Sequence, residues 1–216
     1  MNGNNISEEY SPRGSFIEVV PSQHRFWKNV RLFQNKKEFI SKDFFSEGEN
    51  TILFDSLNNG EYQIKFISYF NDEIDENILI EDSLKKEFPI QLKDYYKINE
   101  FEDFSIEQLS SNDTLQILYQ HFGCFSFEHK LIEYIFDESY TEVRVADWAN
   151  DWIEIKIDNP MDTLNKLIKE GKEINRYEGW CSNSDYYTFR KKGENKISII
   201  EDMSCNWGGI NMITNK

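Results

Sequence analysis

Alanine, proline and cysteine are scarce in this chain of 216 residues, and each scarcity carries information. Four prolines and ten glycines rule out a collagenous or linker-like chain. Three cysteines are an odd number and too few for a disulfide scaffold, which favours reduced thiols. The chain has two alanines, Ala146 and Ala149, beside many isoleucines, asparagines and lysines. This bias follows AT-rich codons and indicates a low-GC bacterium or its phage.

Long apolar runs and the pattern of a secretory leader are also missing from the sequence. No apolar stretch approaches the roughly 18 residues that a membrane-spanning helix needs. The first 15 residues are polar and lack a basic segment followed by an apolar one. We therefore expect a cytoplasmic protein that does not bind membranes.

Aromatic residues supply most of the material for a core. The chain has 17 Phe, 11 Tyr and 5 Trp, and each such side chain buries a large apolar area. Wholesale disorder is therefore excluded despite the high charge. The length allows one generous domain or two small ones packed together, and we expect a single domain over residues 1–216.

Strands are expected early in the chain. Alternating apolar and β-branched residues predict strands at 15–20, 26–33, 51–57 and 61–70. The sequence Asn58-Asn59-Gly60 lies between the last two of these strands and predicts a hairpin, because such residues tolerate positive φ.

Helices are expected in the middle of the chain, where Ser105-Ile106-Glu107-Gln108 fits a capping box. Four residues at helical spacing, Leu115, Leu118, Tyr119 and Phe122, predict a first helix, and residues 127–136 predict a second. The clearest helix is expected over 160–171, with Asn159 as N-cap and Gly171 as its end.

The tail predicts a β-meander, with strands near 176–180, 185–190, 196–202 and 207–213. Strands come early and late and helices lie between them. The expected class is α+β, with a mainly antiparallel sheet, a few helices packed on it and a C-terminal β-meander.

The negative charge is concentrated in the central segment, residues 66–155. This segment holds 21 acids and 6 bases, a net charge of −15, whereas residues 1–65 carry −1 and residues 156–216 carry +1. Six acids fall between Lys65 and Lys85 with no base among them, namely Asp72, Glu73, Asp75, Glu76, Glu81 and Asp82. We expect the exposed acids here to lack a nearby Lys or Arg. Such a negative field attracts a cationic partner and repels nucleic acid, because proteins bind nucleic acid through Lys and Arg side chains that contact its phosphates.

The sequence Asp147-Trp148-Ala149-Asn150-Asp151-Trp152 repeats Asp-Trp at the entrance of an expected strand. If Ile153, Ile155 and Ile157 face the core, Trp152 shares the outer face with Glu154. A tryptophan with a rim of carboxylates is typical of an interface hot spot. The candidate partner-binding residues are therefore Asp72, Glu73, Asp75, Glu76, Asp147, Trp148, Asp151, Trp152 and Glu154. Two core tryptophans and a sugar-binding site are the alternatives.

Three possible metal ligands, His121, Cys124 and His129, lie within nine residues. The apolar spacing before His121 favours an ordinary helix end instead, so we expect neither a metal nor a cofactor. Motifs for nucleotide binding or hydrolysis are missing from the sequence.

These features favour a binding protein that neutralises a basic protein partner. The most concrete form is a bacterial immunity protein that blocks a toxin cutting nucleic acid, because such toxins are cationic and their inhibitors are driven to be acidic and aromatic. One alternative is a nucleic-acid mimic, which needs an extended row of acids. Another is an enzyme using Asp147, Asp151, Glu154 and one of His121 or His129.

Overall fold

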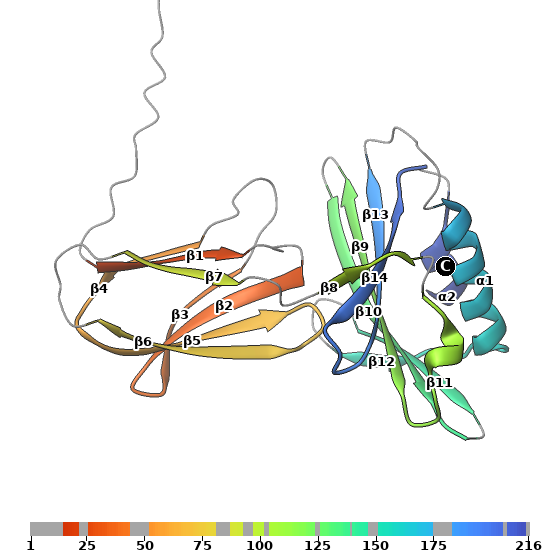
Figure 1. Cartoon of the computed structure of the whole chain (residues 1–216), viewed down its shortest axis with the longest axis horizontal. Helices are drawn as coiled ribbons and strands as arrows, with labels where there is room; N and C mark the ends of the chain where they lie inside the picture. The colour runs from red at the N-terminus through yellow and green to blue at the C-terminus, as the bar shows by residue number, and fades with distance from the viewer. Residues whose placement is uncertain are drawn as a thin grey trace, which may run out of the picture. The chain divides into compact units, whose positions relative to one another are not determined.

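The computed structural model describes eleven stretches of the chain, namely residues 15–21, 26–43, 52–80, 87–92, 97–101, 104–123, 126–138, 140–146, 151–174, 183–204 and 207–214. The chain divides into two compact units, Met1–Asp94 and Tyr95–Lys216 (Figure 1). The expectation of one domain stays a prediction, and each unit is described by itself. None of the helices in these stretches is long and apolar enough to cross a membrane.

Unit 1 contains two sheets, which Figure 1 shows as two layers. The first sheet has the order β4-β1-β7, formed by Ile52–Leu57, Ser15–Pro21 and Glu87–Leu92. The second has the order β3-β2-β5-β6, formed by Lys37–Asp43, Trp27–Gln34, Gly60–Ser68 and Glu73–Ile80. Apolar side chains of both sheets are buried, including Ile17, Val19, Phe54, Leu32, Ile64 and Phe66.

The strands expected on either side of Asn58-Asn59-Gly60 exist as β4 and β5, but the expected hairpin is wrong. Strand β4 pairs with β1, whereas β5 pairs with β2 and β6, so the bend leads from one sheet to the other. Gly60 has φ +148°, and the Tyr62 hydroxyl donates to the Asn58 carbonyl oxygen at 3.0 Å. The local sequence specified the bend correctly, but distant strands decided the pairing.

Unit 2 is built on a seven-stranded sheet of order β12-β11-β10-β9-β13-β14-β8. In chain order these strands are β8 (Lys97–Asn99), β9 (Thr114–Gly123), β10 (Ser126–Phe136), β11 (Thr141–Ala146), β12 (Trp152–Glu154), β13 (Ser184–Lys191) and β14 (Lys196–Asp202). All neighbours in this sheet are antiparallel except β8 and β14. Mostly antiparallel sheet with two helices matches the expected class in outline.

The two helices expected between residues 114 and 136 are wrong, because this region forms β9 and β10. Leu115, Ile117 and Tyr119 alternate along one face of β9 and belong to the main core of unit 2. The other face of β9 is also buried, and it carries Leu118. A central strand that is buried on both faces loses the two-residue period, so its apolar residues can imitate helical spacing.

The helix expected at 160–171 is confirmed as α1, Pro160–Ile174. Its buried residues Leu164, Leu167 and Ile168 belong to the same core as the strands of unit 2. Gly171 does not end the helix. It is buried within it, and a Cβ atom there would collide with the Cδ1 atom of Ile200. Glycine at this position therefore permits a close approach between α1 and β14.

The C-terminal meander is partly wrong. Strands β13 and β14 form the expected hairpin, whose turn includes Gly193 at φ +83°. Residues 209–214 form helix α2, Gly209–Thr214, in place of the last strand. Ile210 and Ile213 are buried three residues apart, and the Ile210 amide donates to the Tyr187 hydroxyl at 3.0 Å. The strand expected at 176–180 lies outside the described residues.

The capping pattern at residues 105–108 forms a short 3₁₀ helix, Ile106–Gln108. The Ser105 side chain accepts a hydrogen bond from the Glu107 amide, as an N-cap does. The capping signal was therefore correct, but no α-helix follows it.

Candidate functional site

The first group of candidate residues lies on β6, at the edge of the four-stranded sheet. Among the described residues β6 pairs with β5 on one side and with no strand on the other. Glu73, Asp75 and Glu76 are exposed, and Asp72 directly before the strand is half-buried. We call these four residues the acidic edge. Their role in binding stays a prediction, but the fold does present three of them to solvent.

One cation lies beside the acidic edge. The Lys65 ammonium on β5 lies 2.8 Å from Glu73 Oε2 and 4.0 Å from Asp75 Oδ1. The hydrogen bond to Glu73 raises the pKa of Lys65, so the ammonium stays charged. The expectation that acids in this region lack nearby bases is therefore wrong for these two residues. Four carboxylates and one ammonium still give the acidic edge and Lys65 a net charge of −3.

A hollow of about 610 Å³ adjoins the far end of β6. Its apolar lining includes Phe33, Ile78 and Leu79, and Leu79 is 52% exposed. Asn77 and Gln63 add amide groups, and Lys36 and Glu61 add one charge of each sign. The edge therefore combines acids at one end with a depression of mixed polar and apolar lining at the other.

The second group of candidate residues lies on β12, at the edge of the seven-stranded sheet. Asp151 and Glu154 are exposed and Trp152 is half-buried. Ile153 shares the face of Val145, as expected, but it is 63% exposed because it lies on the outermost strand. Asp147 and Trp148 lie outside the described residues.

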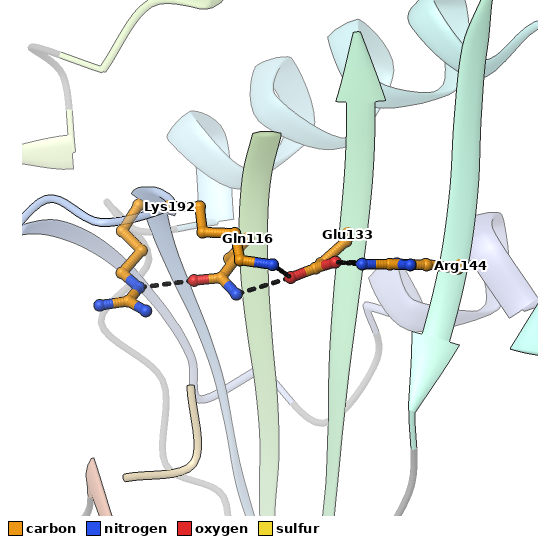
Figure 2. Close-up of polar contacts among 5 residues, drawn as sticks. Gln116, Glu133, Arg144 and Lys192 are labelled. Atoms are coloured by element: carbon orange, nitrogen blue, oxygen red, sulfur yellow. Dashed lines mark hydrogen bonds and ion pairs between the residues drawn. The ribbon is translucent and has the colours of Figure 1, made fainter. Parts of the chain in front are cut away.

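A row of polar side chains runs across the seven-stranded sheet, over the strands that lead to β12. Arg190, Gln116, Glu133 and Arg144 lie opposite one another on four adjacent strands, and Glu154 on β12 is the next backbone partner of Arg144. The Arg190 Nε donates to the Gln116 Oε1 at 2.8 Å, and the Gln116 amide donates to Glu133 at 2.7 Å. We call Gln116, Glu133, Arg144, Arg190 and Lys192 the polar row; Figure 2 shows how four of them converge.

Glu133 is the centre of the polar row, and its side chain is 1% exposed. Its Oε2 accepts hydrogen bonds from Arg144 Nε at 2.8 Å and from Arg144 NH2 at 2.5 Å. Its Oε1 accepts hydrogen bonds from Gln116 and, at 3.0 Å, from the Lys192 ammonium. Burial alone would raise the pKa of Glu133, but these hydrogen bonds outweigh it and hold the pKa below its ordinary value.

The polar row fixes Trp152. The Arg144 guanidinium carbon lies 4.5 Å from the centre of the Trp152 ring, which is close enough for a cation–π interaction. Trp152 is therefore neither a core tryptophan nor a freely exposed anchor. It covers Arg144 and offers its remaining surface to solvent between Asp151 and Glu154.

The expected helix end at His121 is wrong, because His121 lies on β9. Its Nδ1 lies 2.6 Å from Asp185 Oδ1, beside a hollow of about 90 Å³. His121 pairs with Glu128 in the backbone register, whereas His129 pairs with Gln120, so the two histidines lie on opposite faces of the sheet. They cannot share a metal ion. Cys124 lies outside the described residues, among which there is no cluster of three metal-ligating side chains.

The polar row was missed at the sequence level. Gln116 and Glu133 interrupt apolar runs, which was the available signal, but the pairing that joins them spans 17 residues and the pairing of Gln116 with Arg190 spans 74. No family model matches the chain, and a search of curated proteins gave no match. The function must therefore be argued from the geometry alone.

Proposed function

We propose that this chain is a cytoplasmic binding protein that neutralises a basic protein partner. In its most concrete form it is a bacterial immunity protein that blocks a toxin cutting nucleic acid. Such a toxin needs a cationic surface to hold phosphate, and an acidic protein that covers this surface prevents substrate binding. The toxin and its target would both be in the cytoplasm.

The observation that carries the proposal is the acidic edge. Exposed carboxylates of Glu73, Asp75 and Glu76 lie on a strand whose outer side is unpaired among the described residues. Charge on an edge strand also discourages aggregation. If this were the only role of the acidic edge, moving its charges elsewhere on the surface would not change the association with a cationic protein. The two roles therefore differ in a measurable way.

The edge at β12 supplies the aromatic part of the proposal. Trp152 is held by Arg144, so little side-chain entropy would be lost when a partner packs against it. Asp151 and Glu154 are exposed and lie one and two residues from Trp152 in the sequence. Asp147 and Trp148, which lie outside the described residues, are part of the proposal from the sequence alone.

The alternatives have less support from the described residues. A nucleic-acid mimic needs a long row of acids, but the face of β6 that carries Glu73 and Asp75 continues with Asn77 and Leu79. An enzyme that combines Glu154 with His121 is disfavoured, because the strand register places the two side chains on opposite faces of the sheet. His129 shares the face of Glu154 but is buried, with 4% of its surface exposed.

The test is inhibition of purified cationic nuclease domains by the full chain, compared with two charge-reversed variants. The first variant carries Glu73→Lys, Asp75→Lys and Glu76→Lys. The control carries Glu138→Lys, Asp158→Lys and Glu173→Lys, which are also exposed and change the net charge equally. We expect the control to inhibit like the unmodified chain and the first variant to lose at least about tenfold in potency. Equal potency of both variants would contradict a specific role for the acidic edge, and a lack of binding to any cationic protein would contradict the proposed function.

A further inference from the structure

Among the described strands, none pairs with the outer edge of the eight-residue strand β6. Its backbone pairs with β5 from Glu73 opposite Ile67 to Ile80 opposite Gly60, and no described strand lies on its other side. The N–H and C=O groups of such an edge form a template on which another extended chain can pair. The outward N–H and C=O groups of β6 therefore offer a partner hydrogen bonds, in addition to the contacts that the side chains offer.

We propose that β6 binds an extended cationic segment of the partner as a fifth strand of the four-stranded sheet. This inference rests on the proposed function, since it specifies how the basic partner is held. The occupant is a peptide segment with Lys or Arg at alternate positions, followed by an apolar residue.

Charge determines where the cations lie. Asp75 is opposite Lys65 and Asn77 is opposite Gln63, so Glu73, Asp75, Asn77 and Leu79 share one face of the sheet. A strand added beside β6 would place alternate side chains about 4.5–5.5 Å from this face's residues. Lys or Arg residues spaced by two would therefore meet Glu73 and Asp75 directly. Glu76 lies on the other face, where it would meet one of the residues between the cations.

The hollow determines where the apolar residue lies. It adjoins Leu79, Asn77 and Ile78 at the end of β6 away from the acids. Its lining is mixed: Lys36 and Glu61 are among its polar residues, and Phe33 and the exposed Leu79 form an apolar part that an aliphatic side chain would cover. The site therefore has a polarity, with cations at one end of the segment and an apolar side chain at the other.

The two edges of this sheet differ in charge, which selects β6 for a cationic strand. The described residues of β6 include three acids and no base. Strand β3, at the opposite edge, carries Lys37 and Lys42 as well as Glu38 and Asp43. The two lysines and two acids of β3 cancel, whereas β6 is negative, so a cationic segment would be attracted to β6 more strongly than to β3.

The test uses the isotope-labelled full chain and a capped nine-residue peptide that alternates lysine and threonine and ends in leucine. Two further peptides have the same sequence with N-methyl groups on either the odd or the even residues. A strand that pairs along one edge points alternate N–H groups toward its neighbour. We therefore expect one methylated peptide to bind at least about tenfold more weakly than the parent and the other to bind like it. Amide shifts and hydrogen-exchange protection should map to residues 73–80.

Matched variants locate the site. Glu73→Gln with Asp75→Gln should weaken parent-peptide binding by at least about threefold, whereas Glu38→Gln with Asp43→Gln on β3 should leave it unchanged. Equal binding of both methylated peptides, protection on β3, or no binding of the parent peptide would each overturn the strand-addition inference. If cationic nucleases still bind in a way that depends on the acidic edge, the proposed function stands without it. If they do not bind, both fail.

Discussion

The Arg144 guanidinium lies over the Trp152 ring, with its central carbon 4.5 Å from the ring centre. The same guanidinium donates two hydrogen bonds to the buried carboxylate of Glu133. Trp152 lies on the outermost strand of the sheet, whereas Glu133 lies on an interior strand. The contact therefore ties the edge that carries Trp152 to the buried part of the sheet.

Removal of Arg144 should destabilise unit 2. Arg144→Ala leaves the Glu133 carboxylate buried with fewer donors, and we expect the free energy of unfolding to fall by about 2 kcal/mol. This is less than the cost of breaking a fully buried pair, because the Arg144 side chain is 30% exposed. Lys192→Ala is the control: its side chain is 50% exposed and should contribute about 0–1 kcal/mol. Urea denaturation measures both, and an equal loss in the two variants would show that burial does not decide the cost.

Acid should weaken the polar row. The pKa of Glu133 is lower in the folded chain than its ordinary value of 4.5, so its contribution is complete above that pH and is lost as the pH falls through the folded pKa. Glu133→Gln should therefore lower stability near neutral pH and reduce the further loss as the pH falls through and below 4.5. Parallel stability curves for the two proteins over this range would contradict the assignment.

Asp113, which is not part of the polar row, should also make the stability of the chain sensitive to acid. Hydrogen bonds from the Ser110 amide, from Lys191 and from the Ser110 hydroxyl lower its pKa to about 2. The stability that Asp113 contributes is therefore present above its ordinary pKa and is lost as the pH falls toward about 2. In Asp113→Asn this loss should be missing. Carboxyl titration by NMR checks the prediction, and an ordinary pKa at Asp113 would contradict it.

Substitution of Gly171 should disturb the packing between α1 and β14. The new Cβ atom of Gly171→Ala would collide with Ile200 Cδ1, and we expect a loss of about 1–3 kcal/mol although alanine favours helices. Ile200→Val removes that methyl group and should recover part of the loss in the double variant. Additive effects of the two changes would show that the contact with Ile200 is not the cause.

Local signals in the sequence predicted some elements well. The apolar stripe and the Asn159-Pro160 start of α1 were readable because a helix on the surface of a sheet exposes one face to water. Strand β5 of unit 1 alternates for the same reason, because only one of its faces is buried. Strands β9 and β10 were misread because both faces of an interior strand are covered, so the pattern of Leu115 and Leu118 no longer reports the two-residue period.

The candidate site was predictable to a lesser extent. Exposure of Glu73, Asp75 and Glu76 followed from their density in the sequence, but their position on a sheet edge did not. The polar row depends on pairing between residues as distant as Gln116 and Arg190, which no local pattern contains. The partial burial of Trp152 depends on its contact with Arg144. This contact follows from the register in which β11 and β12 pair, which the sequence does not reveal.

The most direct test of the account is the association rate of the full chain with a cationic nuclease domain that it inhibits, measured by stopped flow at low and high salt. The rate should fall steeply with salt for the unmodified chain and for the control reversed at Glu138, Asp158 and Glu173. Reversal of Glu73, Asp75 and Glu76 should slow association at low salt by about tenfold or more and flatten its salt dependence. Identical rates and salt slopes for the two reversed variants would contradict the claim that the acidic edge recognises a basic partner.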